Sequence, residues 1–306
     1  MPAILRPSRL FRVLALLAFL LPEFSGFAQD RSETIRRRLL DPEDGSVLVA
    51  AHRGIWTDAP ENSLEAIEAA VELGVDIVEL DVRRTLDGTL ILMHDPTLGR
   101  TTTGIGFVAL TPYSAIRRLS LKKNGRIVEG SHVPTLEEAL IAAKGRIMVN
   151  IDKGFSFFSQ IVRIAERTGT LGQIIFKSSC NPEEAIKTMG EYRDKVIFMP
   201  VISLKGSGAL ARVYDYSLRL KAPVYELIYG NEALEYPLAV KYLLLGKGRI
   251  WYNTLWPSLC GGYDDAMSAG DPDSGYGFLI GRAGCGVIQT DSSAFLLDYL
   301  RSRGLR

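Results

Sequence analysis

The strongest constraint on the fold is a regular alternation of short apolar segments, rich in β-branched residues, with amphipathic segments of helical periodicity. The expected strands are 46–52, 76–81, 146–152, 173–179, 196–203, 223–228, 250–255 and 286–291. The expected helices between them include 63–73, 157–168, 182–194, 209–220 and 234–245. Such alternation is typical of βα units in a parallel sheet that is buried on both faces. Eight strands in a chain of 306 residues predict an α/β fold, a closed (β/α)8 TIM barrel. A doubly wound open sheet is the alternative, but no glycine fingerprint follows the first strand.

Polar residues stand where most of these strands end. They are His52-Arg53-Gly54, Glu79 and Asp81, Asn150 and Asp152, Lys177-Ser178-Ser179, Glu226, Asn253 and Gln289-Thr290-Asp291. In a TIM barrel the carboxyl ends of the strands converge on one face, where active sites are built. The pattern therefore predicts an enzyme with its site at this face.

The first 28 residues have the pattern of a secretory signal peptide. Three arginines precede the apolar run 13–22, and small residues lead up to Ala28. An uncleaved anchor is the alternative, but the run is short for a membrane span. We therefore expect an exported protein, periplasmic or secreted and without a stable membrane anchor, whose single domain covers 29–306 and carries an insertion at about 95–133.

Bulk charge and cysteine content restrict the partners. With 36 basic and 35 acidic residues, the chain has no overall attraction to nucleic acid, so any phosphate recognition is local. The three cysteines, Cys180, Cys260 and Cys285, lack metal-ligand spacing. In an oxidising compartment Cys260 and Cys285 either pair or remain free and buried.

Residues 82–94 have the pattern of a β-hairpin. Asp87-Gly88 is a dipeptide preferred in two-residue turns. A two-residue turn there places Asp81 opposite His94. The following segment, 95–131, has weak periodicity and is expected to be a loop region over the barrel mouth. A helix is expected to begin after Thr135, which forms a capping box with Glu138.

His52 and His94 are the candidate acid and base. Histidine transfers protons near neutral pH, and a pair can activate a nucleophile while protonating a leaving oxygen. Asp95 is adjacent to His94 and is placed to orient its imidazole. The alternative is that each histidine is structural, whereas His132 is expected at the surface.

Glu79, Asp81 and Asp152 are the candidate metal ligands. Residues i and i+2 of a strand point to one face, which brings Glu79 and Asp81 together. Carboxylates from separate strands suit a hard cation, Ca²⁺ or Mg²⁺, better than Zn²⁺. The alternative is salt bridging to Arg83 or Lys153.

Arg53 has the planar guanidinium that pairs with phosphate, and Lys153 and Lys177 add positive charge. A divalent cation, an arginine and two histidines together suit in-line displacement at phosphorus. The same set also suits carbonyl chemistry on a phosphorylated sugar. The aromatic residues at 251, 252, 256, 263 and 276 indicate either core packing or a pocket for a larger alcohol.

Several ordered motifs resemble those of the glycerophosphodiester phosphodiesterase family. They are AHRG at 51–54, APENS at 59–63, ELDV at 79–82, TLDG at 85–88, MHDPTL at 93–98, RTTTG at 100–104 and VPTLEEAL at 133–140. The resemblance is strong over 46–152 and looser beyond, where GVIQTD at 286–291 is similar to the last strand of the family.

The resemblance implies a phosphoric diester hydrolase, which cleaves small-molecule glycerophosphodiesters to an alcohol and sn-glycerol 3-phosphate. It implies catalysis by His52 and His94, a divalent ion on Glu79, Asp81 and a later acid, phosphate contacts from Arg53, and support from Glu61. It also implies attack by a neighbouring glycerol hydroxyl and a cyclic phosphate that water then opens. One motif departs from the family, which usually has Glu-x-Lys on the third strand, whereas here Asp152 directly precedes Lys153.

Two further functions share these residues. A phospholipase C- or D-like enzyme acting on lysophospholipids or phosphoinositides is favoured by apolar residues at the mouth. A non-catalytic phosphodiester-binding module is favoured by metal binding without turnover.

Overall fold

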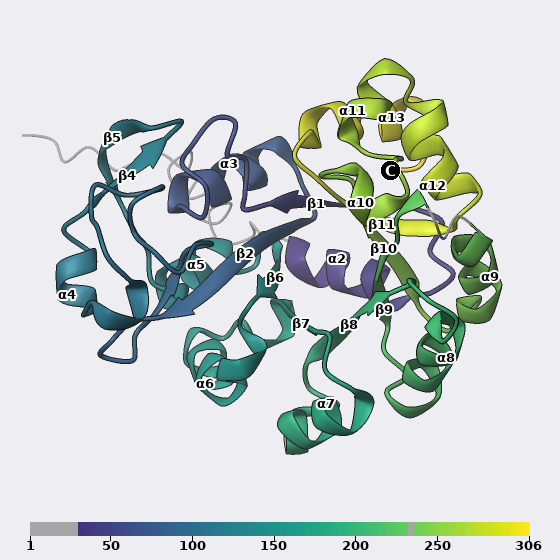
Figure 1. Cartoon of the computed structure of the whole chain (residues 1–306), viewed down its shortest axis with the longest axis horizontal. Coiled ribbons are helices and arrows are strands. Elements are labelled where there is room, and N and C mark those ends of the chain that lie inside the picture. Colours follow the sequence, from purple (N-terminus) through teal and green to yellow (C-terminus); the bar gives the residue numbers. More distant parts are fainter. Residues whose placement is uncertain (1–29, 232–234) are drawn as a thin grey trace, which may run out of the picture. The chain divides into compact units, whose positions relative to one another are not determined.

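Eight parallel strands close into a barrel in the computed structural model, which describes residues 30–231 and 235–306 (Figure 1). Around the barrel the order is β1, β2, β6, β7, β8, β9, β10 and β11, and β11 pairs with β1 to close it. The barrel strands are β1 (Leu48–His52), β2 (Ile77–Arg84), β6 (Met148–Asp152), β7 (Ile174–Ser178), β8 (Ile197–Ser203), β9 (Val224–Ile228), β10 (Arg249–Asn253) and β11 (Cys285–Thr290). The predicted TIM barrel is confirmed, and each expected strand is present.

Helices connect the strands and cover the outside of the barrel. The longer ones are α3 (Leu64–Leu73), α5 (Leu136–Ala143), α6 (Phe158–Thr168), α7 (Pro182–Met189), α8 (Ala209–Arg219), α9 (Glu235–Leu244) and α13 (Ser293–Ser302). Shorter ones are α4 (Tyr113–Ile116), α10 (Pro257–Cys260), α11 (Asp265–Gly270) and α12 (Phe278–Gly281). Local sequence sets their ends: Thr135 and Glu138 form the expected capping box of α5, and Gly74 ends α3 in a left-handed conformation.

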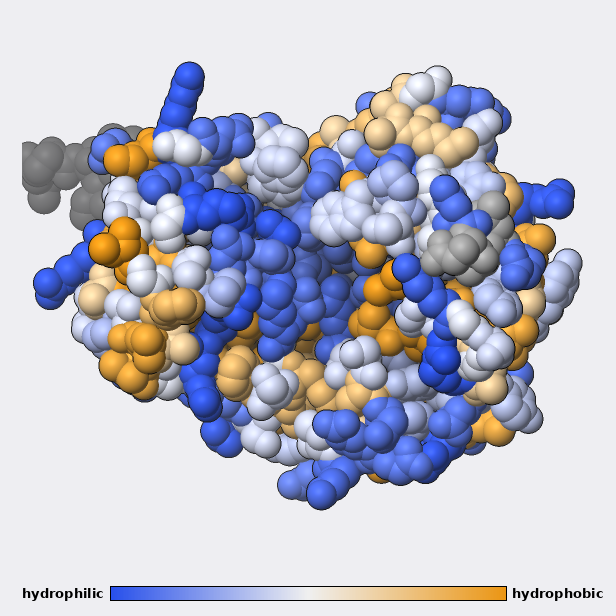
Figure 2. Space-filling model, in the orientation of Figure 1, coloured by the Kyte–Doolittle hydropathy of each residue, from blue (hydrophilic) through white to orange (hydrophobic). Residues whose placement is uncertain are grey.

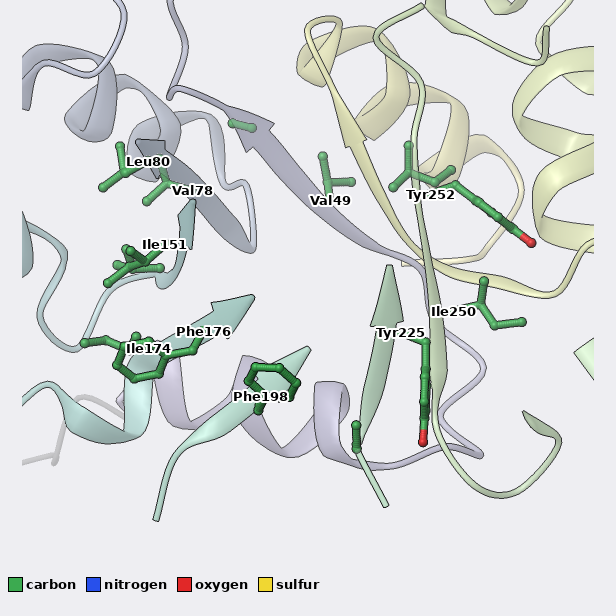
Figure 3. Packing of buried hydrophobic residues seen from close by; sticks show 14 of the residues in the cluster. Val49, Val78, Leu80, Ile151, Ile174, Phe176, Phe198, Tyr225, Ile250 and Tyr252 are labelled. Atoms are coloured by element: carbon green, nitrogen blue, oxygen red, sulfur yellow. The ribbon is translucent and has the colours of Figure 1, made fainter. Parts of the chain in front are cut away.

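Side chains alternate between two separate cores along each strand. One set packs between the strands and the outer helices, as Val49, Leu80, Phe176 and Ile250 do in Figure 3. The other set points into the barrel and includes Leu48, Ile77, Met148, Ile175 and Trp251. This double burial explains why the strands are almost continuously apolar.

The amino end of the barrel is closed by α2 (Arg31–Leu40). Ile35 and Leu39 of this helix pack against the inward-pointing strand residues. Arg31 donates hydrogen bonds to the backbone carbonyls of Gly74, Val75 and Arg146, which lie just before strands β2 and β6. Because this end is filled, the carboxyl end is the open face of the barrel.

Strand β3 (Leu90–Leu92) pairs with β2 in a hairpin whose register differs from the predicted one. Arg84 faces Leu90, and the Met93 amide donates to the Asp81 carbonyl at 2.9 Å. The predicted pairing of Asp81 with His94 is therefore wrong by one residue. The loop has three residues instead of two, because Gly88 adopts a left-handed conformation with φ 84°.

The segment after β3 contains a second hairpin, formed by β4 (Ser120–Lys123) and β5 (Arg126–His132). Asn124 and Gly125 connect them with φ angles of 51° and 77°, the conformation of a tight two-residue turn. This region was expected to be a loop, so its Asn-Gly signal was overlooked.

Other sequence expectations fall partly outside the described residues. The expected signal peptide, 1–28, lies wholly outside them. Within the described part of the chain, no helix has the length and apolar character needed to cross a bilayer. All three cysteines are free, and Cys260 and Cys285 are buried without forming a disulfide.

Candidate active site

Three carboxylates meet at the open end of the barrel. Glu79 and Asp81 lie on β2, and Asp152 is the last residue of the neighbouring strand β6, directly opposite Asp81. One oxygen from each of the three lies within 4.8 Å of the others. The carboxylates predicted to bind a metal are therefore together, and Glu79 and Asp81 are buried.

Asp81 is held from two sides. The Asn62 amide donates to its Oδ2 at 2.9 Å, and the Asp81 amide donates to Asn62 Oδ1 at the same distance. The Lys153 ammonium donates to Asp81 Oδ1 and to Asp152 Oδ2. Burial acts to raise the pKa of Asp81, but Lys153 and Asn62 outweigh it and keep the pKa below its usual value.

Lys153 reaches this site because the strand ends before it. A regular strand turns consecutive side chains to opposite faces, which would direct Lys153 away from Asp152. The backbone of Lys153 instead adopts a left-handed conformation with φ 59°, and its side chain returns to Asp81 and Asp152. In the family that the motifs resemble, the acid and the lysine are usually two positions apart. Here Asp152 and Lys153 are adjacent, and their side chains are still in contact.

Glu79 is as deeply buried as Asp81. Its Oε2 accepts a hydrogen bond from the Arg53 amide at 3.1 Å. Burial, followed by repulsion from Asp81, raises the pKa of Glu79 to about 7. Both amide atoms of the adjacent Asn150 are buried without a hydrogen-bond partner among the described residues.

These residues fit a hard divalent cation. Three convergent carboxylates supply anionic oxygens, and the unpaired Oδ1 of Asn150 shows that the polar interior beside Glu79 is not satisfied by the protein alone. The cysteines are remote in sequence and absent from the cluster, which argues against a soft-metal site. A bound cation must share Asp81 and Asp152 with the Lys153 ammonium.

Glu79 predicts a pH dependence of stability for the metal-free protein. Because its pKa rises on folding, from an ordinary 4.5 to about 7, its contribution to stability is present below pH 4.5 and is lost as the pH rises through 7. The pKa values of Asp81 and Asp152 are lowered, so these two carboxylates change the stability in a more acidic pH range than Glu79 does. In EDTA, the melting temperature of the wild type should therefore fall relative to Glu79→Gln between about pH 5 and about pH 8. A difference that stays constant across this range would contradict the raised pKa.

His52 is bound to a carboxylate at the far end of the sequence. It ends strand β1, and its Nδ1 lies 2.9 Å from Asp291 Oδ1, just beyond β11. Trp56 Nε1 donates to the same oxygen at 2.7 Å. When Nδ1 carries the proton and donates to Asp291, Nε2 is left free to exchange a proton with a bound molecule.

Asp291→Asn should impair catalysis while leaving the fold intact. The change removes the carboxylate that orients the His52 imidazole. We expect kcat/KM to fall about 10- to 100-fold, as is usual when an orienting partner of a functional histidine is lost. The loss should fall on kcat, with KM little changed, because Asp291 acts through His52 and not on substrate binding. A loss confined to KM would contradict this positioning role.

His94 is the end of a chain of charged contacts that leads back to Asp81. Its Nδ1 lies 2.8 Å from Asp95 Oδ1, and Arg100 binds Asp95 at 2.7 and 2.9 Å. Arg100 also binds both oxygens of Glu61, at 2.6 and 2.8 Å. The hydrogen bond from Arg100 is the main reason that the pKa of Asp95 is well below its usual range, so Asp95 stays ionised beside the imidazole.

Arg53 lies between this chain and the carboxylates. Its Nη1 donates to Glu61 Oε1 at 3.0 Å, and its Nε lies 3.5 Å from Asp81 Oδ2. Nε is buried and has no hydrogen-bond partner among the described residues. Arg53 and the next residue, Gly54, form a tight turn in which both φ angles are positive, and a Cβ on Gly54 would lie 2.7 Å from Ala66. Glu61, predicted to support the site, thus holds the guanidinium that was predicted to bind phosphate.

A second ionic group lies deeper in the barrel. The Lys177 ammonium is buried, 3.3 Å from Glu226 and 3.8 Å from Asp152, and Glu226 accepts a hydrogen bond from Asn253 at 2.8 Å. Burial acts to lower the pKa of Lys177, but Glu226, Asp152 and Glu79 outweigh it and raise the pKa. Lys177 is therefore a permanent positive charge beneath the acidic cluster.

A pocket of about 340 Å³ opens beside His52 and Arg53. Its wall continues through Glu61 and Arg100 to the tip of the β4–β5 hairpin, and Trp56 and Trp256 line it as well. Figure 2 shows a hollow in the middle of the drawn face that is lined mainly by hydrophilic residues. Of the aromatic residues singled out in the sequence, Trp251, Tyr252 and Tyr276 are buried, whereas Trp256 is 46% exposed.

Sequence reasoning assigned no role to Asp291, Arg100, Asn62 or Trp56. Asn62 and Arg100 lie inside motifs that were recognised, so each was a visible candidate. Asp291 was noted at a strand end, but its pairing with His52 spans 239 residues. Barrel closure between β1 and β11 brings the two together, and local patterns carry no signal for it.

The fold and the site define a TIM-barrel protein with an acidic, cation-type centre flanked by two carboxylate-bound histidines. Residues 52–161 match the family model of the glycerophosphoryl diester phosphodiesterase family, which confirms the resemblance over that part of the chain. Residues 198–300 match a second model, described as a domain of unknown function.

Curated relatives are similar over about a third of the chain. A glycerophosphodiester phosphodiesterase of Caldanaerobacter subterraneus is 44% identical over 108 residues, which are 34% of this chain and 44% of that protein. Human glycerophosphodiester phosphodiesterase 1 is 42% identical over 106 residues, 34% of this chain and 32% of that protein. The matched region thus spans less than half the length of these relatives.

Solved structures share the whole barrel. A glycerophosphoryl diester phosphodiesterase from Parabacteroides distasonis has a TM-score of 0.70 at 22% identity and covers 89% of this chain and 92% of that chain. A phosphodiesterase from Oleispira antarctica, solved with sn-glycerol-3-phosphate, has a TM-score of 0.64 at 18% identity and covers 85% and 99%. At these identities the likeness shows the fold.

Proposed function

We propose that this protein is a metal-dependent glycerophosphodiester phosphodiesterase, which releases an alcohol and sn-glycerol 3-phosphate. The observation that carries the proposal is the placement of His52 and His94, each bound to a carboxylate, beside the cluster of Glu79, Asp81 and Asp152. The family match over residues 52–161 supports phosphodiester chemistry, and the product bound to the Oleispira structure supports the class of product.

The two histidines move the protons in this proposal. Each uses Nδ1 to bind its aspartate, so Nε2 is the nitrogen that faces the reaction. One imidazole takes the proton of an attacking glycerol hydroxyl while the other protonates the leaving alcohol oxygen. The cyclic phosphate that forms is opened by water with the two roles exchanged.

The scissile phosphate is held by positive charge at the barrel mouth. Arg53 offers its guanidinium, whose orientation Glu61 fixes. Glu79, Asp81 and Asp152 are the residues that hold the divalent cation, Ca²⁺ or Mg²⁺. A bound cation supplies Lewis-acid stabilisation of the phosphate oxygens. Lys153 and Lys177 keep Asp81 and Asp152 ionised, as a cation ligand must be.

We propose that the enzyme acts outside the cytoplasm, after removal of residues 1–28. The basic residues, apolar run and small residues of that segment support export. A fusion of residues 1–40 to a reporter that is active only after export tests this, and a reporter retained in the cytoplasm would contradict it.

The function is tested by product analysis with three substrates. Wild-type protein is incubated with glycerophosphoglycerol, with lysophosphatidylglycerol micelles and with a phosphorylated sugar. The products of each are identified by mass spectrometry, and sn-glycerol 3-phosphate from the soluble diester is also measured by a coupled dehydrogenase. We expect turnover of the soluble diester. Turnover of micelles alone would favour a phospholipase, and diester binding without product would favour a binding module.

A further inference from the structure

We propose that the pocket beside His52 selects diesters whose leaving alcohol carries a second phosphate group, and that Lys122 and Lys123 recognise it. The inference rests on the proposed function, since it concerns the part of the substrate that leaves. It begins from the pocket itself, which extends from His52 and Arg53 to the tip of the β4–β5 hairpin, Lys122 to Gly125. The pocket therefore continues past the position of the scissile phosphate at Arg53.

The charges that line the pocket are not balanced. Arg53 and Arg100 are both bound to Glu61, and Asp291 is bound to His52, so each of these charges already has a partner. Lys122 donates to the backbone carbonyl of Gly99 at 2.9 Å. Within residues 30–231 and 235–306, neither Lys122 nor Lys123 pairs with a carboxylate. Two uncompensated positive charges thus remain at the hairpin end of the pocket.

The hairpin holds these lysines in a defined place. Asn124 and Gly125 form a tight turn that fixes β4 against β5, with Lys123 facing Arg126 across the strands. The hairpin is also joined to the preceding loop at Lys122, whose amide donates to the Thr101 carbonyl at 2.8 Å. The backbone of both lysines is therefore fixed at the edge of the pocket.

The rest of the pocket suits a phosphorylated polyol better than a quaternary ammonium. Trp56 and Trp256 provide flat apolar surface for the carbon skeleton of the alcohol. Indole faces also attract cations, but the uncompensated lysines repel a cationic head group in the same pocket. The net positive charge of the pocket therefore favours a leaving alcohol that carries an anionic group over one that carries a cation.

The test compares kcat/KM for three diesters that differ in the leaving alcohol. The choline diester carries a cation, the glycerol diester is neutral, and the inositol 4-phosphate diester carries the second phosphate. Bis(glycerophospho)glycerol serves as an open-chain source of the second phosphate, to separate recognition of the phosphate from recognition of the ring. At low ionic strength we expect wild type to prefer both phosphate-bearing diesters to the choline diester by about tenfold.

Lys123→Gln should lower kcat/KM for the phosphate-bearing diesters roughly three- to tenfold, while the value for the neutral diester changes less than about twofold. Lys123→Arg should retain the preference, and Lys187→Gln, on the exposed surface of α7, is the matched control. An equal loss on all the diesters would show that Lys123 acts on the scissile phosphate or on folding, and would overturn the inference. An unchanged preference would also overturn it. If wild type hydrolyses none of the diesters, the proposed function itself fails.

Discussion

His52→Ala and His94→Ala should each lower kcat for glycerophosphodiester hydrolysis by about 10²- to 10⁴-fold, the range for loss of a general acid or base. Both imidazoles are placed to transfer protons, since each is oriented by an aspartate and leaves one nitrogen free. KM should change little because Arg53 and the acidic cluster still hold the phosphate. The measurement is steady-state kinetics with glycerophosphoglycerol.

His132→Ala is the matched control for these variants. His132 is the third histidine of the chain and lies on β5, half-buried and outside the candidate site. Its replacement should leave kcat unchanged, and thermal denaturation of all three variants checks folding. Near-wild-type turnover by a folded His52→Ala or His94→Ala protein would contradict the acid/base assignment.

Asp81→Asn should weaken the affinity for a divalent cation by about 100-fold or more, because it removes the central carboxylate of the cluster. The substitution also leaves the Lys153 ammonium with only Asp152 as its partner. Calorimetric titration with Ca²⁺ and with Mg²⁺ measures the change, and activity should fall in parallel.

Glu137→Gln provides the corresponding control for Asp81→Asn. Glu137 binds Arg167 on the outside of the barrel, so the loss of this carboxylate should not alter cation affinity. Unchanged cation binding by Asp81→Asn would exclude the cluster as the metal site.

The sequence predicts the barrel well because its signals are local. Each strand combines an apolar, β-branched run with a polar residue at its end, and parallel strands of a closed barrel bring those ends to one face. For this reason His52 lies at the same face of the barrel as Glu79, Asp81 and Asp152. Strand alternation and barrel topology together are sufficient to place these four residues.

Where prediction fails, a backbone conformation or a distant partner decides the outcome. Left-handed Gly88 lengthens the first hairpin loop and shifts its register by one residue. Left-handed Lys153 turns its side chain back into the site, although strand alternation directs it away. The hydrophobic periodicity of the sequence carries no signal for either left-handed conformation.

Asp291 illustrates the second limit. Its carboxylate becomes the partner of His52 only because β11 closes the barrel against β1. Arg100 likewise joins Glu61 to Asp95 across 39 and five positions of sequence. Such contacts follow from the fold, so the orienting roles of Asp291 and Arg100 emerge only from the structure.

The most direct test of a cation-dependent phosphodiesterase is the rate of sn-glycerol 3-phosphate release from glycerophosphoglycerol in three successive conditions. Wild-type protein is assayed with a divalent cation, then in excess EDTA, and then after the cation is restored. The proposed mechanism predicts turnover, loss of turnover in EDTA, and recovery. Release that persists in EDTA, or no release in any of the three conditions, would contradict it.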